Sequence, residues 1–180
     1  MFEIYEPAED SYLMQEILKK QIVNLLKKNK NMNFLEIGCG SGIQLQTALK
    51  SGIKKENISS VDINKKAVKH CRKLKFNCIQ SNLFESIKGK YNLIVFNPPY
   101  LPENKDEPQS SQLATTGGKK GSEIINKFLK QAKDYLKENG KIFLITSSLT
   151  KGIKWMSWKK ELLGKKKLFF EEVYCWVLEV

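Results

Sequence analysis

Histidine is nearly absent from this sequence, since His70 is the only one among 180 residues. The four cysteines are spread along the chain with no C-x-x-C spacing. Structural zinc sites need clustered cysteine or histidine ligands, and disulfide frameworks are typical of short, cysteine-dense secreted chains. We therefore expect no metal site and no disulfides, and a reducing, cytoplasmic location.

Long apolar runs are also missing. Although 41% of the residues are hydrophobic, no run approaches the ~18 apolar residues of a membrane-spanning helix. Residues 1–12 include Glu3, Glu6, Glu9 and Asp10, so they do not resemble the basic head and apolar stretch of a signal peptide. We expect no membrane association and one domain over residues 1–180, in which residues 1–30 form a lead-in and a first helix.

Arginine is as rare as histidine. Arg72 is the only one, so lysine supplies almost all of the formal net charge of +12. Proteins that read phosphates and bases favour the forked guanidinium of arginine, and lysines scattered along helices indicate a solvated surface. The surplus would raise affinity for a polyanion such as RNA without giving specificity. Nucleic-acid binding is thus conceivable but not favoured.

Helical and strand-like segments alternate along the chain. The first helix, capped by Asp10 or Ser11, is expected to run to residue 26. Further helices are expected at about 43–50, 65–75, 122–136 and 151–163, and strands at 33–37, 58–62, 76–80, 91–96 and 141–146 with a hairpin over 166–180. This alternation predicts an α/β fold with one doubly wound, mostly parallel, seven-stranded sheet and a C-terminal antiparallel hairpin. We expect the strand at 76–80 at an exposed edge, where a partner could add a strand.

A glycine-rich turn, Gly38-Cys39-Gly40-Ser41-Gly42, directly follows the strand that contains Glu36. Glycines let a backbone turn sharply and approach a ligand at a helix N-terminus. Asp62 ends the next strand about 20 residues later, where ribose hydroxyls would need an acceptor. Asp62 could equally cap the helix that begins near Asn64. The pattern predicts a site for a nucleotide-like cofactor.

The apolar strand at 91–96 ends in Asn97-Pro98-Pro99-Tyr100. Proline has no N–H and restricts the residue before it, so the strand must stop there. The side-chain oxygen of Asn97 and the carbonyl of Pro98 could accept both N–H groups of a planar amino group, with Tyr100 stacked on it. A glutamine amide or the exocyclic amine of adenine would fit. A simple turn or a polyproline ligand is the alternative. The polar run at 101–121 is expected to cover the substrate.

Two of these motifs resemble those of class I S-adenosylmethionine-dependent methyltransferases: the first motif at residues 35–42 and the amino-methylating signature at residues 97–100. The sequence Tyr5-Glu6-Pro7-Ala8-Glu9-Asp10-Ser11 resembles the opening of the archaeal and eukaryotic branch of HemK-like glutamine-N5 methyltransferases. The resemblance covers nearly the whole chain. It implies a Rossmann-like fold, S-adenosylmethionine as cofactor, and methylation of the Gly-Gly-Gln glutamine in a class I translation termination factor. It also implies a small zinc-binding activator protein as a partner.

The resemblance also implies roles for individual residues. The residues implied at the cofactor are Ser11, Glu36, Gly38, Gly40, Gly42, Asp62, Asn82 and Asn97, and those at the substrate are Asn97, Pro98, Pro99 and Tyr100. Asn82 replaces a usual acid, and Lys120 stands where bacterial relatives often have aspartate. The signature leaves N6-adenine methylation of DNA or RNA open as an alternative. A non-catalytic scaffold that binds a partner is a further alternative.

Overall fold

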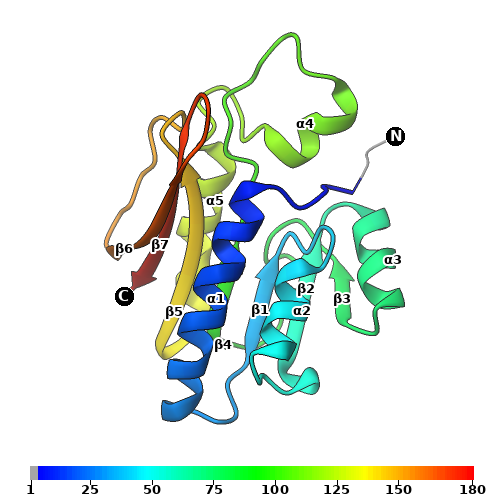
Figure 1. Ribbon diagram of the computed structural model, residues 1–180, viewed down its shortest axis with the longest axis vertical. Coiled ribbons are helices and arrows are strands. Elements are labelled where there is room, and N and C mark those ends of the chain that lie inside the picture. Colours follow the sequence, from blue (N-terminus) through cyan, green and yellow to red (C-terminus); the bar gives the residue numbers. More distant parts are fainter. Residues whose placement is uncertain (1–3) are drawn as a thin grey trace.

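The computed structural model describes residues 4–180, which form one seven-stranded sheet flanked by helices (Figure 1). The first three residues of the predicted lead-in lie outside the described residues. The strands are β1 (Phe34–Ile37), β2 (Ile58–Asp62), β3 (Asn77–Gln80), β4 (Tyr91–Phe96), β5 (Leu136–Ser147), β6 (Lys159–Lys167) and β7 (Glu172–Glu179). The helices are α1 (Glu9–Lys28), α2 (Ile43–Lys50), α3 (Lys65–Lys73), α4 (Gln109–Thr115) and α5 (Glu123–Ala132), with 3₁₀ turns η1 (Lys55–Asn57) and η2 (Lys133–Tyr135).

The strands follow the order β3-β2-β1-β4-β5-β7-β6. The first five strands in this order are parallel, and β7 lies antiparallel between β5 and β6. The winding reverses between β1 and β4, where the chain first turns one way to β2 and β3 and later the other way to β5. This confirms the predicted doubly wound, mostly parallel sheet with a C-terminal antiparallel hairpin. Ligands of such folds bind beyond the carboxyl ends of the strands at the reversal.

The core lies on both faces of the two central strands. All four residues of β1 are buried, including Glu36, and so are the last four of β4, which explains why the end of β4 reads as a short continuous apolar run. On one face, α1 packs beside α2 (Figure 1). On the other face, Phe128 of α5 packs against Phe96 at the end of β4, with ring centroids 4.7 Å apart. The ends of β1 and β4 are therefore fixed from both sides.

The predicted helix over residues 151–163 is wrong. Residues 159–167 form β6, which pairs antiparallel with β7 from Lys159 opposite Glu179 to Lys167 opposite Glu172. Trp155, Trp158 and Leu162 recur at helical spacing, but pairing with β7 overrides this local pattern. Trp155 instead packs edge-on against a tryptophan of β7, with centroids 5.6 Å apart.

Three boundaries also differ from the prediction. The first helix starts at Glu9 after Ala8, with no side-chain cap, because Asp10 bonds elsewhere. The helix expected to reach residue 136 ends at Ala132, where η2 leads straight into β5. The polar run at residues 101–121 contains the helix α4. The hydroxyls of Thr115 and Thr116 at the end of this helix donate hydrogen bonds to the Glu107 carboxylate. No helix in the described part of the chain is long and apolar enough to cross a membrane.

Candidate active site

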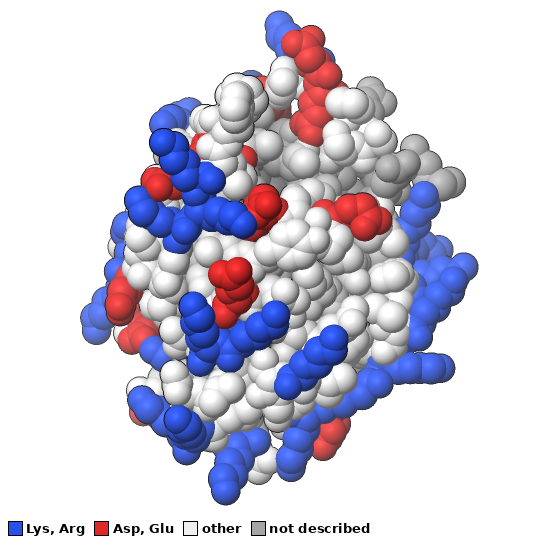
Figure 2. All heavy atoms as spheres, in the orientation of Figure 1, with Lys and Arg blue, Asp and Glu red and all other residues white. Residues whose placement is uncertain are grey.

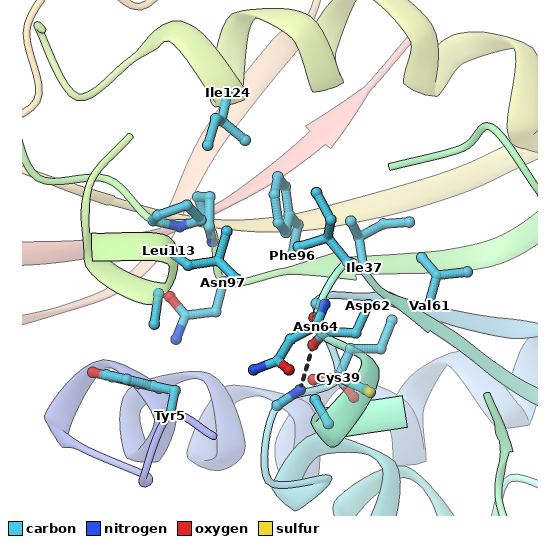
Figure 3. Close-up of a pocket in the computed structure, with 18 of the residues that line it drawn as sticks. Tyr5, Ile37, Cys39, Val61, Asp62, Asn64, Phe96, Asn97, Leu113 and Ile124 are labelled. Carbon is cyan, nitrogen blue, oxygen red and sulfur yellow. Dashed lines mark hydrogen bonds between the residues drawn. The ribbon is translucent and has the colours of Figure 1, made fainter. Parts of the chain in front are cut away.

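A cavity of about 300 Å³ opens at the carboxyl ends of β1, β2 and β4 (Figure 3). Its walls come from the start of α1, the glycine turn after β1, the end of β2 and the residues after β4, with α4 and α5 above. Among the residues that line it are Ser11, Glu36, Gly38, Gly40, Asp62, Asn82, Asn97, Pro98 and Pro99. The structure therefore brings nearly all of the predicted site residues to one cavity.

The glycine turn bends tightly over the end of β2. Gly38 and Gly40 have φ values of +73° and +46°, which residues with a Cβ rarely adopt. The N–H of Gly38 donates to the carbonyl of Val61 at 2.8 Å. Gly42 is the exception among the predicted cofactor residues, because it is not part of the cavity lining. A Cβ at Gly42 would come within 3.2 Å of the Cys71 sulfur of α3, so this glycine allows close packing between α2 and α3.

Asp62 holds the glycine turn in place. One carboxylate oxygen accepts the N–H of Gly40 at 2.9 Å and the other accepts the N–H of Asn64 at 2.7 Å (Figure 3). Burial raises the pKa of Asp62, while these two hydrogen bonds oppose the shift. Asn64 itself caps α3, because its side chain accepts the N–H of Lys66 at 3.0 Å. Asp62 thus orders the turn and also faces the cavity.

Glu36 is a deeply buried carboxyl group at the cavity, with 4% of the residue exposed. Burial, the nearby Asp62 carboxylate and the Cys78 sulfur raise its pKa well above the usual value. Its Oε2 atom has no hydrogen-bond partner among the described residues. Buried polar atoms nearly always have a partner, so such an atom points to a ligand. A buried carboxylate at a cavity favours a cationic ligand group.

Gln44 and Asn97 carry the other two buried side-chain oxygens without a partner in the described chain. Gln44 donates its Nε2 to the carbonyl of Ser11 at 2.8 Å, which leaves Oε1 free to face the cavity it lines. Asn82 lines the same cavity and donates to Glu85 at 2.8 Å. S-adenosylmethionine has an ammonium group at its amino acid end, ribose hydroxyls and an adenine, so acidic and amide groups around this cavity fit it.

Backbone packing fixes the segment Asn97–Tyr100. A Cβ on Gly117 would lie 2.5 Å from the carbonyl oxygen of Pro99, and one on Gly121 would lie 2.3 Å from that of Tyr100. The hydroxyl of Thr150 donates to the same Tyr100 carbonyl at 2.8 Å. The glycines after α4 therefore allow the covering loop to lie directly on the backbone of this segment, which explains why they stand there.

The Tyr100 side chain lies away from the main cavity. It is 8% exposed, and its hydroxyl donates to Asp10 at 3.1 Å. Asp10 also accepts the hydroxyl of Tyr5 at 3.2 Å. Burial, followed by the Asp10 charge, raises the pKa of both tyrosines. Tyr100 lines an adjoining cavity of about 190 Å³ that shares Pro98 with the main one. Stacking of Tyr100 on a bound amino group stays a prediction.

Sequence reasoning missed several residues of the site. Tyr5 was named only within the opening motif, and Asp10 there and as a possible cap of the first helix, yet both line the main cavity. Leu113 of α4 and Ile124 of α5 close it from above (Figure 3). A leucine and an alanine within the otherwise polar run 101–121 were the available signal for α4.

The described residues include no group of three or more histidine, cysteine or acidic side chains able to hold a metal ion. The four cysteines are free and buried. The sulfur of Cys39 in the glycine turn lies 3.2 Å from the sulfur of Cys78 in β3.

Comparison with known proteins finds relatives that are similar over most of the chain. Residues 19–165 match the model of the methyltransferase small domain family. A Methanocaldococcus jannaschii protein, provisionally named as a protein N5-glutamine methyltransferase, is 40% identical over 95% of this chain and 89% of its own length. The eRF1 methyltransferase catalytic subunit mtq2 of Schizosaccharomyces pombe is 28% identical over 83% of this chain and 74% of its own. One chain of the E. cuniculi Mtq2–Trm112 complex, described as responsible for methylation of the eRF1 translation termination factor, superposes with a TM-score of 0.72 at 24% identity and 97% coverage of both chains.

The family model covers most of the chain, and the M. jannaschii relative is similar over almost all of it. The chain therefore belongs to the methyltransferase small domain family, as a HemK-like, class I S-adenosylmethionine-dependent methyltransferase.

Proposed function

We propose that this enzyme methylates the side-chain amide nitrogen of the glutamine in the Gly-Gly-Gln sequence of a class I translation termination factor. The observation that carries the proposal is the Asn97 side chain, whose Oδ1 atom is buried without a partner at the end of β4. The names of the M. jannaschii and S. pombe relatives support the same substrate class.

The cofactor would be held by residues at the ends of β1 and β2. Glu36 would face the ammonium group at its amino acid end, Gly38 and Gly40 would allow close backbone approach, and Asp62 would accept hydrogen bonds from the ribose hydroxyls. Ser11 lines the same cavity and would contribute from α1. When bound, S-adenosylmethionine supplies a methyl group on a positively charged sulfur, which is a strong electrophile.

Asn97 and Pro98 would align the substrate. The Asn97 Oδ1 atom and the Pro98 carbonyl accept the two N–H groups of the glutamine amide, which fixes the plane of the amide and exposes its nitrogen to the methyl group. Orientation of this kind accounts for much of the rate, and the two oxygens stabilise positive charge that develops on the nitrogen. The nitrogen gains a methyl group and releases one proton. That proton becomes acidic as the N–C bond forms, so no strong base is required.

The test is mass spectrometry of a termination factor after incubation with the enzyme and deuterated S-adenosylmethionine. We expect one labelled methyl group, mapped to the Gly-Gly-Gln glutamine. The Asn97→Ala variant should lose turnover while its affinity for the cofactor stays within about threefold, because its contact is to the substrate. Retained turnover would contradict the role of Asn97. Methylated adenine in a parallel RNA or DNA reaction, with an unmodified factor, would transfer the proposal to the alternative substrate.

A small activator protein, zinc-binding as the resemblance implies, belongs to the same proposal. The E. cuniculi structure is a complex of two proteins, and the S. pombe relative is named as a catalytic subunit. Strand β3 forms an edge of the sheet and pairs only with β2 among the described strands, and its Ile79 is 38% exposed. Such an edge can accept a strand from a partner. Copurification with the activator should therefore be lost in Ile79→Lys but kept in the control Val23→Lys on α1.

A further inference from the structure

The turn between β6 and β7 exposes two aromatic rings. Phe169 and Phe170 are 92% and 84% exposed, and the next most exposed large apolar residue in the described chain is Met156 at 65%. The two rings meet edge to face with centroids 4.7 Å apart. Tight hairpin turns normally use glycine, asparagine or aspartate. Two phenylalanines here serve neither the turn nor the core, and exposed apolar patches of this kind mark interaction sites.

The position of this turn is fixed. The N–H of Leu168 donates to the carbonyl of Glu171 at 2.7 Å, and the Glu171 carboxylate accepts the hydroxyl of Ser147 at the end of β5. Lys166 forms an ion pair with Glu9 at the start of α1. Figure 1 shows the turn at the same end of the molecule as α4 and the start of α1. The two rings are thus held at the end of the sheet where the active site lies.

The turn also borders the substrate side of the site. Leu168 and Glu171 line the cavity of about 190 Å³ that contains Tyr100 and Pro98. Pro98 lines both this cavity and the main one, as do Tyr5, Asp10 and Ala114. If the main cavity holds the cofactor, a glutamine that reaches the Pro98 carbonyl comes from the side of the smaller cavity. The polypeptide that carries it then lies across the rim formed by the turn.

Charge at this rim favours a protein over a polyanion. Lys165 is paired with Glu172 at 2.9 Å, Lys166 is paired with Glu9, and Glu171 adds a further negative charge. In Figure 2, acidic and basic side chains are mixed over the upper half of the face, and basic side chains outnumber acidic ones in the lower half. RNA and anionic membranes bind best where lysines gather without acidic neighbours. An apolar, nearly neutral rim suits an apolar patch on a protein.

We propose that Phe169 and Phe170 form a docking point for the termination factor, where both rings pack into an apolar patch beside the loop that carries the glutamine. The inference rests on the proposed function and adds how the whole substrate protein is held. Aromatic side chains contribute much of the binding energy at protein interfaces. The pair contacts neither the cofactor residues nor Asn97, so its contribution is to binding of the protein substrate.

The test compares methylation of the intact factor by the wild type, the double variant F169S/F170S and the control M156S. The double variant should raise KM for the factor by about 10- to 100-fold, as expected for loss of a pair of interface anchors. Its kcat, its affinity for S-adenosylmethionine and its Tm should stay unchanged, because both side chains are exposed. M156S, which removes an exposed apolar side chain outside the turn, should behave as the wild type. An unchanged KM in F169S/F170S would overturn the proposal.

A second measurement does not depend on methyl transfer. With the photo-crosslinker p-benzoylphenylalanine incorporated at position 169, we expect a crosslink to the factor within the domain that carries Gly-Gly-Gln. A wild type that fails to methylate the factor both with and without the activator protein refutes the proposed function, while a missing crosslink refutes the docking point even if methylation occurs. Loss of binding to RNA or to anionic lipid vesicles in F169S/F170S, with KM for the factor unchanged, would assign the rings to another partner and overturn the proposal.

Discussion

The hydrogen bond between Asp10 and Tyr100 should couple the start of α1 energetically to the segment Asn97–Tyr100. Asp10 is 4% exposed, and its carboxylate accepts the hydroxyls of Tyr100 at 3.1 Å and Tyr5 at 3.2 Å. Tyr100→Phe removes one hydrogen bond to a charged group, which should lower the free energy of unfolding by about 1.5–3 kcal/mol. Asp10→Ala leaves the Tyr100 hydroxyl buried without its acceptor and weakens the hold on Tyr5, so it should cost about 3–5 kcal/mol.

The double-mutant cycle isolates this pair. In the Asp10→Ala background the Tyr100 hydroxyl has lost its partner, so Tyr100→Phe should then cost almost nothing. The interaction energy should be about 1.5–3 kcal/mol, measured by urea unfolding of the four proteins at pH 7. Tyr12→Phe on the exposed face of α1 is the control and should change stability by less than about 0.5 kcal/mol. If the costs of the two single variants add up to the cost of the double variant within about 0.5 kcal/mol, the coupling is refuted.

Three further predictions concern the same end of the molecule. Glu36→Gln replaces a buried carboxylate by a neutral amide, so calorimetry should show S-adenosylmethionine binding weakened about 10- to 100-fold, and equal affinity would refute a charged contact. Burial raises the pKa of Tyr5 and Tyr100. Their contribution to stability is therefore complete below about pH 10 and is lost as the pH rises further. The urea midpoint should fall between about pH 8 and 11 in the wild type, and it should fall less steeply in the variant in which both tyrosines are phenylalanine. Gly121→Ala places a Cβ 2.3 Å from a carbonyl oxygen at φ +79°, so it should lower the free energy of unfolding by at least about 3 kcal/mol. Gly89 has a similar φ of +84° but nothing within 4 Å of its Cβ position, so Gly89→Ala should lower it by only about 1–2 kcal/mol. Thermal unfolding of both variants measures the difference.

Much of the sheet could be predicted because its signals are local. The apolar run before Asn97 and the glycines after Glu36 mark strand ends whatever the rest of the chain does, and both ends lie at the cavity as expected. Strand β2 was predicted residue for residue, as a short strand that ends in Asp62. These features depend on neighbours within a few residues, so the sequence displays them directly.

The parts that escaped prediction depend on distant partners. The hydroxyl of Tyr100 donates a hydrogen bond to Asp10, which lies 90 residues away in sequence. Residues 159–167 are mostly lysine and leucine and form a strand only because β7 pairs with them. Gly42 fits the motif by spacing, yet the packing of α3 against it is visible only in three dimensions. Tertiary contacts of this kind leave no local pattern to read.

The contact between the first helix and the last hairpin has a consequence for the order of folding. Leu13 and Ile17 of α1 are 7% and 6% exposed, and both lie against Gly164 of β6, about 150 residues later. As the chain leaves the ribosome, α1 would therefore keep part of its apolar face uncovered until β6 has been made. Contacts this far apart in sequence form late and slowly. The residues that α1 supplies to the active site would be placed only at the end of folding, so a nascent or truncated chain would be both inactive and prone to aggregate.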